Sequence, residues 1–118
     1  MLCKVDKHSG IPAYMQIMNQ VKKEVILGNL KNGDQLSPVR ELQNTFGVNI
    51  NTVNRSLEKL STEGFIDSKH GIGHFVKTDF EVDPEVMEII KNCSKKLKEK
   101  NMNIHIAILL LEEVWKNG

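Results

Sequence analysis

The side chains best suited to molecular recognition stand close together, at Asn51, Thr52, Asn54 and Arg55. An asparagine amide can pair with two edge atoms of adenine, an arginine guanidinium can pair with two edge atoms of guanine, and threonine can bond to several bases. The stretch therefore predicts a surface that reads DNA bases. Two alternatives stay open: Asn51 and Thr52 could be ordinary polar residues at the start of a helix, and Arg55 could bind a phosphate.

A second group, Lys69, His70 and Gly71, makes a basic, glycine-containing segment. It lies between two short apolar runs, residues 65–66 and 75–76, and its glycine permits the backbone angles of a tight hairpin tip. The pattern predicts a hairpin whose tip enters a minor groove or lies on phosphates. His70 could instead be an ordinary exposed residue of that tip.

Apolar residues repeat with a helical period on both sides of a short turn: Val39, Leu42 and Phe46 before it, and Val53, Leu57 and Leu60 after it. Within the turn, Gly47 suits the left-handed end of the first helix. Asn49 suits the cap of the second helix, and it could serve only there or could also contact DNA. A helix, a glycine-containing turn and a second helix with a polar leading face are typical of the helix-turn-helix motif.

A longer set of residues extends this motif: Leu36, Val39-Arg40-Glu41-Leu42, Val48-Asn49, Asn51-Thr52-Val53, Arg55, Glu63-Gly64-Phe65, Gly71, Gly73 and Phe75-Val76. The set resembles the winged-helix domain of GntR-type bacterial transcription regulators, and the similarity continues upstream to Ile11-Pro12. The resemblance implies a winged helix-turn-helix fold and a place for Arg40 at the DNA surface. Arg40 could instead form an ion pair with Glu41.

The order Ser37-Pro38 departs from the family pattern, in which proline precedes serine. We expect Ser37 to cap the first helix of the motif, with Pro38 as the first helical residue. Because proline cannot donate a hydrogen bond, it stays open whether position 38 keeps the phosphate contact that the resemblance implies for a serine there.

The length suits one domain plus an accessory piece, and the composition is ordinary for a soluble globular protein. The net charge of the 118 residues is only +1, but residues 1–78 hold ten basic against seven acidic side chains, and residues 79–118 hold six against eight. This asymmetry supports a nucleic-acid-facing N-terminal part. No apolar stretch is long enough for a transmembrane helix, and residues 1–10 lack a signal-peptide core. We therefore expect a cytoplasmic protein with no membrane partner, and reduced thiols at Cys3 and Cys93.

Catalytic chemistry has no support in the sequence. The histidines are scattered, no metal ligands are paired, and no glycine-rich loop could cradle a phosphate. We predict no enzyme activity, no metal and no cofactor.

Residues 79–118 differ in character from the rest. A polar connector at 77–83 leads into a helix that Asp83 caps and Pro84 begins; a break at 101–103 precedes a second helix. The apolar surface of these helices is too wide for two short helices to bury. It resembles the short tail of YtrA-type GntR regulators, which implies dimerisation through Ile89, Cys93, Leu97, Ile104, Ile108, Leu111 and Trp115. The alternatives are that the helices fold back on the winged domain and that Cys93 is simply a small buried apolar residue.

Together these observations predict a mainly α protein with a small β-hairpin (α+β). A winged helix-turn-helix DNA-binding domain would occupy residues 1–78, and a two-helix dimerisation segment residues 79–118. The predicted function is a transcription regulator that binds an inverted-repeat operator in double-stranded DNA as a homodimer. We expect a repressor, with activation left open and any small-molecule effector unidentified. The alternative is a protein-interaction scaffold that keeps the winged fold without reading DNA.

Overall fold

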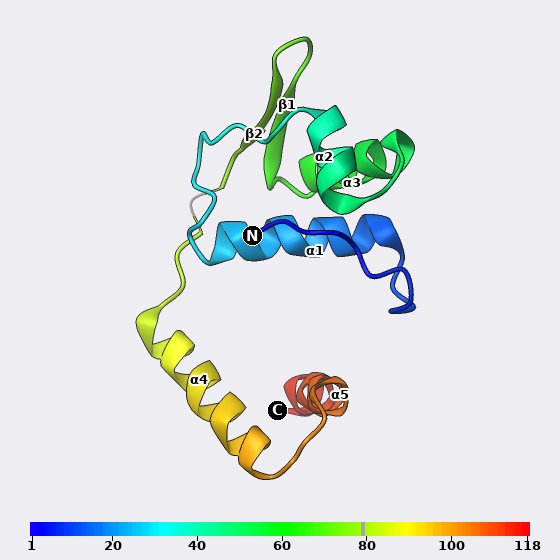
Figure 1. Ribbon diagram of the computed structural model, residues 1–118. Helices are drawn as coiled ribbons and strands as arrows, with labels where there is room; N and C mark the ends of the chain where they lie inside the picture. Colours follow the sequence, from blue (N-terminus) through cyan, green and yellow to red (C-terminus); the bar gives the residue numbers. More distant parts are fainter. Residues whose placement is uncertain (79) are drawn as a thin grey trace. The chain divides into compact units, whose positions relative to one another are not determined.

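The computed structural model describes residues 1–78 and 80–118 (Figure 1). This part of the chain holds five helices and one antiparallel pair of strands, which confirms the predicted mainly α fold with a small hairpin: α1 (Ala13–Ile26), α2 (Val39–Phe46), α3 (Ile50–Thr62), β1 (Ile66–Lys69), β2 (Gly73–Val76), α4 (Pro84–Glu99) and α5 (Ile104–Asn117). The chain divides into two compact units, residues 1–81 and 82–118. The predicted connector at 77–83 includes Asp79, which lies outside the described residues.

The core of the first unit forms where α1 packs against α3 and α2 closes one side. Figure 1 shows α1 passing along the base of α2 and α3, with the hairpin extending away from it. The apolar faces that the helical periodicity predicts are buried here: Ile17, Val21 and Val25 of α1, Leu42 and Phe46 of α2, and Val53, Leu57 and Leu60 of α3. Their burial removes apolar area from water and so fixes the orientation of α3.

The hairpin is tied to the segment that precedes α2. In the β1–β2 pair, Ile66 lies opposite Val76 and Lys69 opposite Gly73. The Leu36 amide donates to the His74 carbonyl at 2.8 Å, and the Val76 amide donates to the Asp34 carbonyl at 2.8 Å. These bonds hold the wing in a fixed relation to the start of the helix-turn-helix motif.

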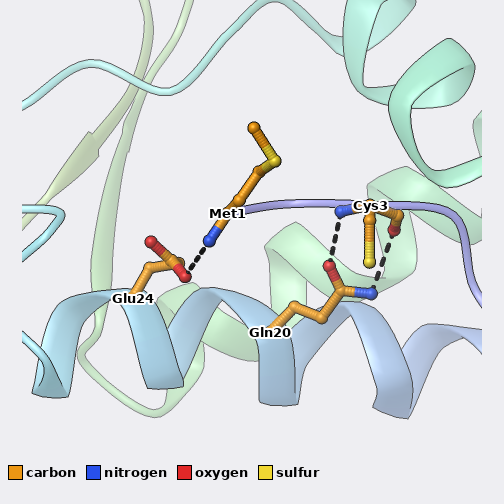
Figure 2. A network of polar contacts seen from close by, with 4 residues as sticks. All are labelled: Met1, Cys3, Gln20 and Glu24. Atoms are coloured by element: carbon orange, nitrogen blue, oxygen red, sulfur yellow. Dashed lines mark hydrogen bonds and ion pairs between the residues drawn. The ribbon is translucent and has the colours of Figure 1, made fainter.

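The first residues of the chain run along α1 and are held there by the side chains of Gln20 and Glu24 (Figure 2). The Cys3 amide donates to Gln20 Oε1 at 2.8 Å, while Gln20 Nε2 donates to the Cys3 carbonyl at 3.0 Å. The Met1 ammonium group pairs with the Glu24 carboxylate, and the Val5 amide donates to the Phe46 carbonyl at 3.1 Å. The N-terminal segment therefore connects α1 to the end of α2.

The Met1–Glu24 pair predicts a pH-dependent contribution to stability. The hydrogen bond from the ammonium group is the main reason that the pKa of Glu24 lies below its ordinary value of 4.5, against a smaller opposing effect of burial. Because the folded-state pKa is lowered, this contribution is present above pH 4.5 and is lost as the pH falls through the folded-state value. We expect Glu24→Gln to lower the urea midpoint slightly at neutral pH, with the difference from wild type shrinking on acidification. A difference that grows on acidification would contradict this assignment.

The second unit consists of α4 and α5. The predicted cap of α4 by Asp83 is confirmed. Asp83 Oδ1 accepts from the Glu85 amide at 2.8 Å, and Asn103 caps α5 by accepting from the His105 amide at 2.8 Å. No side chain of either helix is buried. Cys93 is exposed, so its interpretation as a buried apolar residue is wrong for the single chain. Within the described residues, no helix has the length and apolarity needed to cross a bilayer.

Candidate nucleic-acid interface

Local sequence sets the start of α3 as predicted. Gly47 ends α2 with a left-handed backbone, φ 67°, a conformation that glycine adopts without the steric cost of a Cβ. Asn49 then caps α3, its Oδ1 accepting from the Thr52 amide at 3.0 Å and from the Thr52 hydroxyl at 3.1 Å. This cap ends the turn between α2 and α3 and determines the residue at which α3 begins.

The residues predicted to read bases share the exposed side of α3. Val53, Ser56, Leu57 and Leu60 are buried, whereas Asn51, Asn54 and Arg55 are exposed. Thr52 is half-buried and engaged with Asn49. The core face thus directs two free amides and one guanidinium outward, although base contact by any of them stays a prediction.

Asn49 has a structural role that can be separated from DNA contact by experiment. Asn49→Ala is expected to cost about 1 kcal/mol of unfolding free energy, because the Thr52 amide loses its partner. Asn49→Asp keeps an oxygen in the same place and should retain the stability of wild type. If Asn49→Asp is stable and binds DNA with wild-type sequence preference, Asn49 acts only as a cap. Urea unfolding followed by circular dichroism measures the first effect, and a loss below about 0.3 kcal/mol would contradict the capping role.

The start of α2 differs from expectation. The helix begins at Val39, Pro38 occupies the cap position with φ −55° and ψ 152°, and no side chain caps it. The expected cap by Ser37, with Pro38 as first helical residue, is wrong. The reason is the extended backbone of Pro38: its carbonyl accepts the first helical bond from the Leu42 amide at 3.0 Å, which leaves Ser37 one residue outside the helix.

Arg40 lies on the first turn of α2 with an exposed side chain. Within the described part of the chain its guanidinium forms no ion pair, with Glu41 or with another acid. The charge is therefore accessible at the side of the motif where the resemblance locates a DNA contact.

An open groove of about 490 Å³ separates the start of α2 from the wing, lined by residues 35–39 and 68–74. His70 and Gly71 are exposed at the wing tip, and Lys69 Nζ lies 5.2 Å from the centre of the Phe75 ring. His74 is different: it is half-buried and its Nδ1 lies 2.7 Å from the Ser68 hydroxyl. The groove thus brings the predicted wing residues next to the first turn of α2.

The contact between Tyr14 of α1 and Arg55 of α3 could not be predicted from the sequence. The Tyr14 ring lies against Arg55, with 3.8 Å between Cζ of the guanidinium and the ring centre, and Lys59 Nζ lies 5.5 Å from the same centre. Lys22, which also lies on α1, pairs with Glu63 at 2.7 Å. Periodicity assigns Tyr14 to the apolar face of α1, and nothing in the sequence indicates which side chain of α3 it meets.

Comparison with known proteins agrees with this geometry. Residues 13–76, from α1 to the end of β2, match the bacterial regulatory proteins of the gntR family. The chain is 31% identical over 115 residues to the HTH-type transcriptional repressor YtrA of Bacillus subtilis (strain 168), which covers 96% of this chain and 86% of that protein.

Solved structures extend the similarity to three dimensions. YtrA from Sulfolobus acidocaldarius, a GntR-family transcription factor, matches with a TM-score of 0.61 and 33% identity, over 81% of this chain and 99% of that one. AraR(DBD) in complex with operator ORE1 matches with a TM-score of 0.56 over 64% of this chain and 93% of that one. At 22% identity, the AraR match shows the fold alone.

The matched stretch contains the complete winged helix-turn-helix motif and its supporting helix α1. The relatives in the family are transcription regulators and not enzymes, which agrees with the prediction of a non-enzymatic protein. The chain belongs to the GntR family of bacterial transcription regulators and is a DNA-binding regulator similar over almost its whole length to YtrA.

Proposed function

We propose that the chain is a cytoplasmic repressor that binds an inverted-repeat operator as a homodimer. The observation that carries the proposal is the exposed polar face of α3, where Asn51, Asn54 and Arg55 face solvent opposite a buried core face. A helix of this kind fits the major groove, and its amides match base edges. Support also comes from AraR(DBD), a domain of this fold bound to an operator.

Residues 1–78 would form the DNA-binding domain. Phosphate contacts fix the register of such a domain on the duplex, and base contacts choose the sequence. Lys69 lines the groove between the wing and the start of α2, and exposed Arg40 directly follows Val39 of that lining. A DNA backbone strand along this groove would therefore lie near both cations. The proposed DNA-contacting residues are Arg40, Asn49, Asn51, Thr52, Asn54, Arg55, Lys69, His70 and Gly71.

Residues 79–118 would form the dimerisation segment. Every large apolar residue of α5 is exposed, with Trp115 at 80% and Ile104 at 67%. Monomeric proteins rarely leave such a continuous apolar surface in water. Ile104, Ile108, Leu111 and Trp115 follow the spacing of one helical face, and Ile89, Cys93 and Leu97 do so on α4. A second copy of the same segment offers a self-complementary surface of the same chemistry, as a two-fold dimer requires.

Selection of binding sites from random duplex DNA tests the proposal. The full chain is expected to enrich an inverted repeat, because a two-fold dimer presents two identical recognition helices. Enrichment of a single unrepeated motif would contradict the dimeric arrangement. Enrichment of no motif would favour the alternative, a protein-interaction scaffold that has kept the fold.

Salt dependence is a second expected property. Arg40, Lys59 and Lys69 are exposed cations near the proposed interface. If each binds one phosphate in both protomers, the logarithm of the association constant should fall with the logarithm of salt concentration with a slope of roughly −5. Fluorescence anisotropy at a series of salt concentrations measures this slope. A flat titration would mean that these charges do not lie on phosphates.

A further inference from the structure

Two adjacent residues of α3 hold Tyr14 from two directions. The buried Ser56 hydroxyl lies 3.2 Å from the Tyr14 carbonyl and 2.8 Å from the Thr52 carbonyl of its own helix, and these two acceptors share its single proton. The Arg55 guanidinium covers the Tyr14 ring with 3.8 Å from Cζ to the ring centre. The first contact places the backbone of Tyr14 next to the buried side of α3. The ring is therefore a platform on which Arg55 is stacked instead of extending freely into solvent.

Lys59 joins the same platform. It lies one helical turn after Arg55, on the same edge of α3, and its Nζ is 5.5 Å from the centre of the Tyr14 ring. Both cations are exposed. Neither forms an ion pair with an acid among the described residues, whereas the neighbouring Lys22 is paired with Glu63.

This arrangement suits an anion. Two like charges brought to one aromatic ring repel each other, and a shared anion would remove that repulsion. An open hollow of about 440 Å³ adjoins them, lined by Arg55, Glu58, Lys59, Thr62 and Glu63. Glu63 is neutralised by Lys22, which leaves Glu58 as the only unpaired acid of this lining, against two cations.

We infer that Tyr14, Arg55 and Lys59 form a phosphodiester-binding site for the DNA strand beside the recognition helix, with Tyr14 as the positioning residue. A stacked guanidinium keeps its N–H edge free, and that edge binds phosphate oxygens in a bidentate manner. The site lies on the edge of α3 next to α1, because Ser56 on that side lies 3.2 Å from the Tyr14 carbonyl. Choice of sequence by α3 then rests on Asn51 and Asn54.

The inference rests on the proposed function, and the two can fail separately. The test uses the full chain, its selected operator, a panel of operators with single base-pair changes, and anisotropy titrations in several salt concentrations. With Arg55 as a fourth phosphate-binding cation in each protomer, the expected wild-type salt slope is roughly −7, instead of the roughly −5 that three cations per protomer give. Arg55→Ala should weaken binding to every duplex by about the same factor, on the order of tenfold, and should make the slope shallower by about 2 per dimer.

Variants of Tyr14 separate positioning from folding. Tyr14→Phe keeps the ring and should bind like wild type. Tyr14→Leu should reproduce part of the loss seen with Arg55→Ala, and it should add nothing when combined with Arg55→Ala, because both changes act on one contact. Lys59→Ala should lower the salt slope in the same direction. Arg55→Lys, which keeps the charge without the planar fork, should be intermediate in affinity.

Lys23→Ala is the matched control, since Lys23 is an exposed lysine of α1 that takes no part in the cluster; it should leave the slope unchanged. The inference is overturned if Arg55→Ala changes the preference at one base pair and leaves the salt slope intact, because Arg55 would then read a base. It is also overturned if Tyr14→Leu and Arg55→Ala weaken binding additively. If the wild-type chain selects no operator, the proposed function itself fails.

Discussion

A chain that ends after Val82 is expected to be a monomer whose operator affinity is lower than that of the full chain by about 10²- to 10⁴-fold. The size of the effect follows from tethering: in a dimer, binding of one half-site holds the second recognition helix at a high effective concentration near the other half-site. The shortened chain keeps the buried core, since every buried residue in the described part of the chain lies between Val5 and Val76. Loss of affinity would therefore not reflect loss of the DNA-binding fold.

Sedimentation velocity and anisotropy titrations measure these two effects. In the full chain, Leu111→Asp should have the same consequence, because it introduces a charge on the exposed apolar side of α5. Glu112→Gln, one residue further on and already polar, should leave the dimer intact. A dimer that persists in the shortened chain would show that the contact between protomers lies in the first unit.

Phe46→Ala is expected to lower the free energy of unfolding by about 3–5 kcal/mol. Phe46 is 1% exposed and belongs to the core shared by α1, α2 and α3, so its removal leaves a cavity where the helix-turn-helix motif is held together. Domains of this size have total stabilities of about 5–15 kcal/mol. The variant should therefore be partly unfolded at physiological temperature and should bind its operator weakly.

Urea unfolding followed by circular dichroism provides the measurement for Phe46→Ala. Phe46→Leu fills most of the same volume and should lose about 1.5 kcal/mol or less. The assignment of Phe46 to the core would be wrong if the alanine and leucine variants were equally stable.

Local signals made most of the first unit predictable. The spacing of Val53, Leu57 and Leu60 determines which side of α3 is buried, and hence that Asn51 and Asn54 are exposed. Gly47 and Asn49 mark the turn because each supplies something that few residues can: a left-handed backbone and a capping oxygen. These features depend on a few neighbouring residues, so the sequence contains them directly.

Features that depend on tertiary contacts were not predictable. The stacking of Arg55 on Tyr14 joins residues far apart in the sequence, and neither residue type indicates its partner. The pairing of Gln20 with the Cys3 backbone has no periodic signature either. The failed cap at Ser37 has a smaller cause, because the backbone angles of Pro38 decide by a single residue where α2 begins.

Sequence-specific binding is the central claim, and one comparison tests it most directly. The full chain is titrated against its selected operator and against a duplex of the same composition in scrambled order, at one fixed salt concentration. We predict an affinity ratio of at least about 10³ in favour of the operator, as is usual when base contacts add to phosphate contacts. Equal affinities would contradict the claim, because phosphate contacts alone cannot distinguish the two duplexes.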